Sequence, residues 1–445
     1  MPDPMKLALI SPRGPLYRHK TGIWKRSLRY APLTLTTLAA LIPDDVTVEL
    51  TLIDEGVHEM DTELDVDLVG ISAITGTAPR AYDIADRFRE RGVPVVLGGV
   101  HPTLMPDEAA RHADCVVTGY AEDTFPQLLR DHRAGALRPR YDQATGLSLA
   151  GRPFPKRELL PGADHALLHT IEATRGCIHR CDFCVVPSAW GQPLQRPVNE
   201  VVDDIRQMGA RRLVFLDLNP IADVAYAKEL FTALIPLKIV WGGLATTLIA
   251  RDPELLDLAA RSGCRGLLLG FESLSPTVLH ASKKGFNALQ DYHLVMARLH
   301  DAGIAVMGCF VFGFDDDTAE TFDATADFVH EANVDLPRYA ILTPFPGTPL
   351  FQRMEREGRI LKRDWSLYDG QHAVFQPARM SAPELERRTE WAWKRTYRWA
   401  SIAKRLVNAR IQLPAALAAN MGYRYYAHNL HRFYTCDWPL LRAAA

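Results

Sequence analysis

Three cysteines stand close together near the middle of the chain, in the string TRGCIHRCDFC. Their C-x3-C-x2-C spacing puts three thiols on one tight loop. Three thiolates can hold three irons of a cubane iron–sulfur cluster and leave the fourth iron without a protein ligand. Such an open iron is a place for chemistry, so Cys177, Cys181 and Cys184 are the candidate metal ligands and catalytic residues.

A zinc site is the alternative for these thiols. A structural zinc ion needs four ligands in closed tetrahedral geometry, and His179 inside the loop could supply the fourth. No fourth cysteine lies nearby, since the others are Cys115, Cys264, Cys309 and Cys436. The residues around the cysteines favour iron and sulfur.

The segment IEATRGCIHRCDFC resembles the first strand and cluster loop of the radical S-adenosylmethionine (SAM) enzymes. The shared features are an apolar strand that ends in Thr174, Arg175 and Gly176, and an aromatic residue, Phe183, before the last cysteine. The resemblance implies that SAM chelates the open iron of a 4Fe–4S cluster and that an electron from the cluster cleaves SAM to a 5'-deoxyadenosyl radical. The cofactors would carry the difficult chemistry, while the protein binds, orients and excludes water.

Length and composition indicate a large enzyme of a reducing compartment. The 445 residues predict two or three domains, and the 47% of hydrophobic residues suffices for sizeable cores. A formal net charge of -2 gives no general case for nucleic acid as a partner. Seven cysteines, three of them in the cluster motif, argue against a disulfide framework. The first apolar run is too short for a signal peptide, and no stretch of about 18 apolar residues occurs, so we expect a cytoplasmic protein.

The first 140 residues alternate apolar strands with amphipathic helices. Strands are expected at 6–11, 46–54, 67–74, 93–99 and 115–119. This α/β pattern predicts a doubly wound parallel sheet, which binds ligands at the carboxyl ends of its strands. Glycines gather there, and the absence of side chains at Gly98 and Gly99 would let a flat ligand approach the backbone. The alternative is that these glycines only make strand-to-helix turns.

Placed before a radical SAM core, this region resembles the cobalamin-binding domain of one large subclass of that family. The nearest equivalents of its pocket elements are Ser72 in the string Ser-Ala-Ile and the pair Gly98 and Gly99. The D-x-H-x-x-G motif that supplies a cobalt-ligating histidine is absent, and the closest string is YRHKTG at 17–22. The resemblance implies cobalamin without an imidazole from that position. The alternative is a degenerate domain that has lost the cofactor.

Residues 141–166 carry proline, glycine and mixed charges without a sustained period and are expected to form a linker. From 167 to 350, six strand-like runs alternate with helical stretches: LHTIEAT, RRLVFLDL, KIVWGGL, GLLLGFES, AVMGCFVFG and RYAILTP. Six such units predict the partial (β/α)6 barrel usual for radical SAM enzymes. Active groups of barrels collect at the carboxyl ends of the strands.

Several residues at those strand ends resemble SAM-binding elements of the family. Asp217 or Asn219 would accept a hydrogen bond from the amino group of SAM, although the usual Gly-Gly-Glu triplet is missing. Glu272 would bind the ribose hydroxyls, and the backbone from Gly308 to Gly313 would lie against adenine. The alternative for each residue is ordinary turn or helix-cap chemistry.

Two lysines follow Glu272 in the chain. Lys283 and Lys284 are expected at a solvated helix end, with contact to a carboxylate as the alternative.

The segment ILTPFPGTPLFQRMEREGRI, at 341–360, resembles the last-strand segment of the cobalamin-associated group. The same pattern occurs in relatives that include hopanoid methylases and the anaerobic Mg-protoporphyrin monomethyl ester oxidative cyclase. Those enzymes act on large apolar molecules by different reactions, so the resemblance does not fix the substrate.

The last part of the chain, 351–445, is expected to be mainly helical, and its composition changes from 381 onward. That stretch holds eleven Lys and Arg against four Asp and Glu, interleaved with Trp and Tyr. Such a mixture suits a peripheral contact with an anionic membrane, and it could also stack on nucleic acid bases. The alternative, which we expect, is that these helices pack on the barrel and bury their aromatic residues.

The sequence therefore predicts a cobalamin-dependent radical SAM enzyme. Its expected reaction is methylation of an unactivated carbon of an apolar or secondary-metabolite substrate, with electrons from a donor such as flavodoxin or ferredoxin. A radical cyclisation or rearrangement is the alternative within the subclass. An alternative from a different class is a non-catalytic cluster or cobalamin carrier, which the intact cysteine motif beside candidate SAM motifs argues against.

Overall fold

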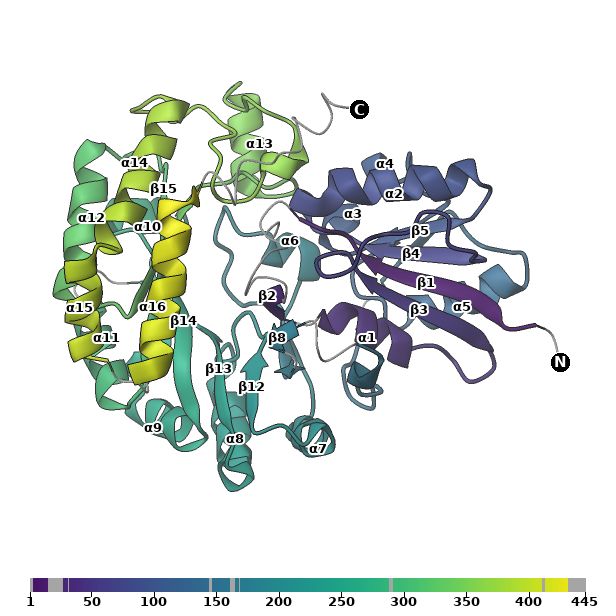
Figure 1. The fold of residues 1–445 in the computed structure, drawn as a ribbon, viewed down its shortest axis with the longest axis horizontal. Helices are drawn as coiled ribbons and strands as arrows, with labels where there is room; N and C mark the ends of the chain where they lie inside the picture. Colours follow the sequence, from purple (N-terminus) through teal and green to yellow (C-terminus); the bar gives the residue numbers. More distant parts are fainter. Residues whose placement is uncertain are drawn as a thin grey trace. The chain divides into compact units, whose positions relative to one another are not determined.

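The computed structural model divides the chain between Thr170 and Ile171 into two units (Figure 1). Two short later segments, 188–191 and 364–366, belong to the first unit. The structure describes residues 3–14, 27–30, 32–143, 146–160, 165–167, 169–287, 291–409 and 413–430. The string around His19 lies outside these ranges.

A six-stranded parallel sheet forms the first unit, in the order β3-β1-β4-β5-β6-β7. Its strands are β1 (Met5–Ser11), β3 (Val48–Asp54), β4 (Leu68–Ser72), β5 (Val95–Gly98), β6 (Cys115–Thr118) and β7 (Arg140–Asp142). The five expected strands and the doubly wound class are confirmed. The sixth strand, β7, escaped prediction because its sequence, Arg-Tyr-Asp, carries no apolar run. Separately, β2 (Ser27–Tyr30) pairs with β8 (His165–Leu167).

Helices cover both faces of this sheet, as a sheet that is apolar on both sides requires. One core joins the sheet to α2, and the other joins it to α1 and α5. The helices of the unit are α1 (Leu33–Ala40), α2 (Ala78–Glu90), α3 (Val100–Leu104), α4 (Pro106–Ala109) and α5 (Thr124–Arg133).

The second unit is built on another six-stranded parallel sheet, in the order β16-β15-β14-β13-β12-β9. The strands are β9 (Thr170–Ile171), β12 (Arg212–Phe215), β13 (Val240–Ala245), β14 (Cys264–Glu272), β15 (Ala305–Phe312) and β16 (Leu336–Ile341). Each strand overlaps one of the six predicted runs, and β13, β14 and β16 extend one or two residues beyond theirs, so the partial barrel is confirmed. Its helices are α7 (Val198–Met208), α8 (Val224–Leu234), α9 (Pro253–Arg261), α10 (Pro276–Ala281), α11 (Tyr292–Asp301) and α12 (Ala319–Glu331). The short α6 (Val186–Trp190) precedes them.

Three helices of this unit begin at the same kind of dipeptide. Asp252, Ser275 and Thr348 each precede a proline, and each side chain accepts a hydrogen bond from a backbone N–H of the first turn. The cap satisfies an otherwise unpaired donor, and proline at the first helical position has no N–H to satisfy. The local sequence therefore sets where α9, α10 and α13 (Pro349–Arg356) begin.

Three further helices follow the barrel: α14 (Ala382–Thr396), α15 (Trp399–Val407) and α16 (Leu413–His428). Trp393 on α14 and Tyr397, the residue directly after it, are fully buried. Trp393 meets the ring of Tyr339 edge to face at 5.5 Å, and the Tyr397 hydroxyl donates to the Pro337 carbonyl at 2.9 Å. Packing of the tail on the barrel is thus confirmed for these residues. Phe433, Tyr434 and Trp438 lie outside the described part.

Within the described ranges, no helix combines the length and the apolar character needed to cross a bilayer.

Replacing Trp393 by Ala should lower the free energy of unfolding by about 3–5 kcal/mol, because a fully buried indole leaves a large cavity. The matched control is Trp399→Ala, where the ring is 58% exposed and the change should stay within about 0.5 kcal/mol. Denaturant melts of the two variants beside the parent measure the difference. Equal losses at both positions would contradict the packing of α14 described above.

Candidate functional site

The cysteine loop starts and ends in a short antiparallel ribbon. β10 (Thr174–Arg175) pairs with β11 (Leu194–Gln195), so the residues between them are held at both ends. Gly176 opens the loop with φ of 79°, and a Cβ there would lie 3.1 Å from the Gln192 carbonyl oxygen. A side chain at 176 would be strained and crowded, which explains the glycine after Arg175.

Cys177 lies among hydrogen-bond donors. Its sulfur accepts from the His179 backbone N–H at 3.4 Å and from Asn219 Nδ2 at 3.5 Å. Hydrogen bonds to the sulfurs are a regular feature of iron–sulfur cluster sites. The chemistry of this donor set therefore fits a cluster ligand.

The thiols of the other two cysteines are affected mainly by burial. Burial raises the pKa of Cys181 to about 12, and it raises the pKa of Cys184 as well. Among the described residues, no three His, Cys, Asp or Glu side chains gather as ligands of one ion. A cubane cluster makes no such demand, because each thiolate binds a different iron.

The segment 282–286, which follows α10, packs against the cysteine loop. The Ser282 carbonyl accepts from the Asp182 N–H at 3.2 Å, and the Cys181 thiol lies 3.9 Å from the Lys283 carbonyl. Phe286 stacks on His179 with ring centres 3.8 Å apart. The loop thus has a wall on this side that was not predicted from the sequence.

A second contact holds the same loop from α13. Asp182, between two of the cysteines, accepts from Arg353 Nη1 at 2.9 Å, and its carbonyl accepts from the Leu350 N–H at 3.0 Å. Arg353 lies more than a hundred and fifty residues away in sequence, so no local pattern could have indicated this contact.

Asp217 and Asn219 follow β12 and face different partners. The Asp217 carboxylate is fully buried and accepts from the Ala173 N–H, the Thr174 N–H and the Thr174 hydroxyl. Burial raises its pKa to about 7, and the hydrogen bond from Thr174 acts against that shift. Asp217 thus holds the strand that leads into the cysteine loop. The SAM contact expected of it stays a prediction.

Asn219 is the better-placed of the two for a ligand. Its side chain is buried, its Nδ2 reaches Cys177, and its Oδ1 has no hydrogen-bond partner. A buried amide oxygen without a partner costs free energy unless a ligand supplies a donor. The amino group of SAM, bound beside the cluster, is such a donor.

Glu272 stands at the end of β14, where the strand register shifts and the backbone adopts φ of 64°. A bulge of this kind re-aims a side chain at a strand end. The Glu272 carboxylate forms an ion pair with Lys284 Nζ, and both side chains are about one-tenth exposed. A Cβ on Gly270 would meet both charged groups, so the glycine leaves room for the pair.

Lys284 was expected at a solvated helix end, and that expectation is wrong, because its side chain is buried beside Glu272. Burial alone lowers the pKa of Lys284, but the charge and hydrogen bond of Glu272, with smaller effects of Cys181 and Cys184, raise it overall. A buried ammonium therefore faces both the predicted ribose ligand and the cluster thiols. Lys283, by contrast, is exposed, as expected.

The loop after β15 brings Gly313 and Phe314 to the same region. Gly313 has φ of 106°, and its N–H and that of Phe314 donate to Asp317 at 2.8 and 3.0 Å. Phe314 meets Phe183 of the cysteine loop edge to face at 6.1 Å. Gly308 lies elsewhere: a Cβ there would lie 2.8 Å from Val334, so packing within the strand layer accounts for that glycine.

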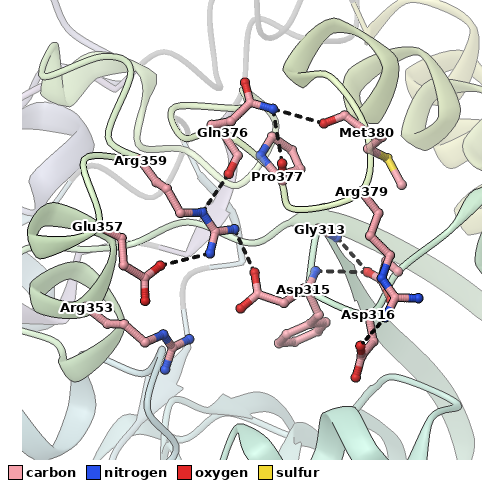
Figure 2. A network of polar contacts seen from close by, with 12 residues as sticks. Gly313, Asp315, Asp316, Arg353, Glu357, Arg359, Gln376, Pro377, Arg379 and Met380 are labelled. Carbon is pink, nitrogen blue, oxygen red and sulfur yellow. Dashed lines mark hydrogen bonds and ion pairs between the residues drawn. The ribbon is translucent and has the colours of Figure 1, made fainter.

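Ion pairs fix this loop from the segment after α13 (Figure 2). Arg359 donates to Asp315 at 2.6 Å, to Glu357 at 3.1 Å and to the Gln376 carbonyl at 2.9 Å. Arg379 donates to Asp316 at 2.8 Å. The chain beyond the barrel thus helps to hold the predicted adenine-binding backbone in place.

In the first unit, Ser72, Gly98 and Gly99 come together at the ends of β4 and β5. Gly99 has φ of 97°, and a Cβ there would come within 2.9 Å of Ala73 and Ser72. Gly98 differs, because a Cβ there would have only atoms of Val117, at 3.7 Å, within 4 Å. The fold thus requires glycine at 99 and would tolerate a Cβ at 98. The absence of a side chain at Gly98 lets a ligand lie against the strand end.

Two polar residues that were not predicted from the sequence support these strand ends. The Thr103 hydroxyl donates to the Gly99 carbonyl at 2.7 Å and accepts from the Gly119 N–H at 2.9 Å. His101 is fully buried, 3.4 Å from the Thr75 hydroxyl and 3.4 Å from Glu108. The only sequence signal for either is its position just after the glycine pair.

Replacing Cys177, Cys181 or Cys184 by Ala should reduce iron from about four atoms per chain to a small fraction, because each thiolate holds one iron of the cubane. Cys264→Ala is the control, since Cys264 begins β14, at the end of the strand opposite Glu272. Iron and sulfide analysis of anaerobically purified protein makes the comparison. Stoichiometric zinc in place of iron in the parent would contradict the cluster.

Replacing Gly98 by Leu should prevent corrin uptake and leave iron content unchanged, because the added side chain would fill the open space at the strand end. Gly98→Ala is the graded control and should remain folded. Visible absorbance of protein reconstituted with cobalamin reports uptake. Undiminished cobalamin binding by Gly98→Leu would show that the corrin does not lie against this strand.

Comparison with known proteins bears on the whole chain. The radical SAM superfamily model matches residues 171–329, and the B12 binding domain model matches residues 25–129. Bacteriochlorophyllide d C-12(1)-methyltransferase of Chlorobaculum tepidum is 34% identical over 351 residues, which cover 76% of each chain. Bacteriochlorophyllide d C-8(2)-methyltransferase of the same organism is 30% identical over 85% of this chain and 88% of its own. Hopanoid C-2 methylase and the anaerobic cyclase, which the sequence pointed to, also match.

A solved structure agrees in fold. The radical SAM methyltransferase TsrM of Kitasatospora setae, with cobalamin and a [4Fe–4S] cluster bound, superposes with a TM-score of 0.65 over 93% of this chain and 90% of its own, at 18% identity. The two family models and the two methyltransferase relatives together account for both units. Cluster, SAM and cobalamin are accordingly the cofactors of this enzyme, and the chain belongs to the cobalamin-binding radical SAM methyltransferase family.

Proposed function

We propose that this enzyme methylates an unactivated carbon on a side group of a large apolar molecule of the chlorin or related tetrapyrrole class. The observation that carries the proposal is the identity of 34% and 30% to two enzymes that both act on bacteriochlorophyllide d. The anaerobic cyclase matches at 25% identity, so methylation is favoured over cyclisation. A shared substrate class is the simplest account of two such relatives.

The residues of this chain have separate tasks in that reaction. When bound, the cluster and SAM would supply a radical that abstracts a hydrogen atom, and cobalamin would supply the methyl group, which a second SAM then restores. Asn219 Oδ1 accepts from the amino group of SAM, and Glu272 binds the ribose hydroxyls. Gly313 offers its backbone to adenine. Asp217 acts as a positioning residue through Thr174.

The ion pair between Lys284 and Glu272 gives the ribose ligand a defined charge before SAM arrives. A carboxylate buried without a partner is costly, and Lys284 offsets that cost through its ion pair with Glu272. The pair thus prepares Glu272 for SAM.

We further propose that a flavodoxin or ferredoxin of the cytoplasm delivers the electrons. The cluster must be reduced once for each SAM that is cleaved to a radical, and such carriers work at the low potentials that clusters of this kind require. We also propose a peripheral membrane contact of the carboxyl-terminal region, because a large apolar substrate partitions into lipid.

The test uses the anaerobic enzyme loaded with cluster and cobalamin, SAM with a deuterated methyl group, and a bacteriochlorophyllide d as substrate. The expected result is 5'-deoxyadenosine together with a chlorin that carries the deuterated methyl group, detected by mass spectrometry. Cys181→Ala is the control and should form neither product. A chlorin that has lost hydrogen without gaining label would indicate cyclisation. Formation of 5'-deoxyadenosine with the chlorin unchanged would exclude this substrate class.

A further inference from the structure

Exposed apolar side chains gather on the helices α15 and α16. Of the twelve large hydrophobic residues that are exposed in the described part of the chain, five lie between 399 and 421. They are Trp399 at 58%, Val407 at 85%, Leu413 at 57%, Leu417 at 45% and Met421 at 38% exposure. Single exposed apolar residues are common, whereas a local group of five marks an interaction surface.

The group occupies the outer side of the two helices. Leu413, Leu417 and Met421 are four residues apart, so they form one stripe along α16. The buried residues Ala416 and Asn420 lie on another face of the same helix.

The inner side of α16 packs against α14 and the barrel. Tyr423 stacks on Trp393 with ring centres 6.1 Å apart, and its hydroxyl lies 3.7 Å from the sulfur of Met307 on β15. Packing against the barrel therefore fixes which way the stripe points. Leu413, Leu417 and Met421 are left on the side that faces away from these contacts.

The charges that α15 and α16 themselves carry are all of one sign, while Asp323 and Asp327 of α12 pair with Arg395 just before these helices. No Asp or Glu occurs from 391 to 430, a stretch that contains seven Lys and Arg. Arg424 of α16 lies over the Trp399 ring at 4.3 Å, which joins the beginning of α15 to the far end of α16. Arg398 and Lys404 are exposed. Such a face attracts an anionic surface and repels a second copy of itself.

We propose that the outer face of α15 and α16 binds the surface of an anionic lipid bilayer. Apolar side chains enter the boundary between headgroups and acyl chains, Trp399 sits at the headgroup level, and the surrounding cations meet lipid phosphates. The inference rests on the proposed function in one respect: an apolar substrate would be collected from the same bilayer. The surface itself is defined by exposure and charge alone.

The experiment measures flotation of the full-length holoenzyme with vesicles, without substrate. Vesicles of phosphatidylcholine with phosphatidylglycerol should carry the enzyme, and vesicles of phosphatidylcholine alone should carry much less. Partitioning should weaken as salt rises from 0.1 M, where the screening length is about 10 Å, to 1 M, where it is about 3 Å. Lys404→Glu should weaken it by more than about fivefold, because each basic residue contributes about 1 kcal/mol near such a surface and the variant adds a repulsive charge.

Leu417→Glu should weaken partitioning by about tenfold or more, because it removes apolar area and adds an anion. The matched control is Leu294→Glu on α11, where a leucine of nearly equal exposure, 47%, is changed in the same way outside the patch. That variant should bind vesicles like the parent. Both positions are exposed, so the variants should remain folded, and thermal melts verify this.

Three results would overturn the proposal. One is equal binding by Leu417→Glu and Leu294→Glu. Another is absence of binding to anionic vesicles by a holoenzyme that still forms 5'-deoxyadenosine. The third is a dimer that Leu417→Glu dissociates, which would assign the face to a second copy. If vesicles bind as expected but no chlorin is methylated, the membrane surface stands and the substrate proposal fails.

Discussion

The cysteine loop has almost no regular structure of its own. Contacts from other segments of the second unit must therefore hold its three thiols in place. Three thiols must keep fixed positions on a segment whose ends are tied by a two-residue ribbon. Contacts from distant parts of the chain supply the missing rigidity. Asp217 binds the incoming strand, Asn219 reaches Cys177, and Arg353 binds Asp182 between two of the ligands. The barrel thus acts as a frame that orders one loop from several directions.

Two opposite charges are buried together in the same interior. A lone charge in the place of Glu272 or Lys284 would be costly in a medium of low polarity. As a pair, each offsets the cost of burying the other at the predicted ribose site, and the Lys284 ammonium is also close enough to interact with Cys181 and Cys184. The ion pair explains why residue 270 is a glycine, because a side chain there would displace the two charged groups. The charged groups of Glu272 and Lys284 occupy the space beside Gly270, whereas no protein atom lies as close to the position of a Cβ on Gly98.

The sequence predicted the strands of both sheets well apart from β7, and it also singled out the cysteine loop, whose role as cluster ligand stays a prediction. The reason that both could be recognised is physical. Buried parallel strands form short apolar runs, and metal ligands on one loop have a fixed spacing, so both signals are local. What the sequence could not predict depended on pairs far apart in the chain, such as Asp182 with Arg353. Lys284 was misjudged because a lysine pair after a short helix is usually solvated. Only the three-dimensional position of Glu272 shows that it is not.

The carboxyl-terminal helices show why composition alone leaves two interpretations open. Basic and aromatic residues there were expected either to pack on the barrel or to meet a membrane, as though the two excluded each other. Helical periodicity separates them by face: Trp393 and Tyr397 are buried against β16, while Trp399 and Leu417 are exposed on the outer side. A helix packed on a core is also the rigid support that an interfacial surface needs, because a helix already ordered loses little entropy on binding. The inner contacts therefore favour the outer function instead of competing with it.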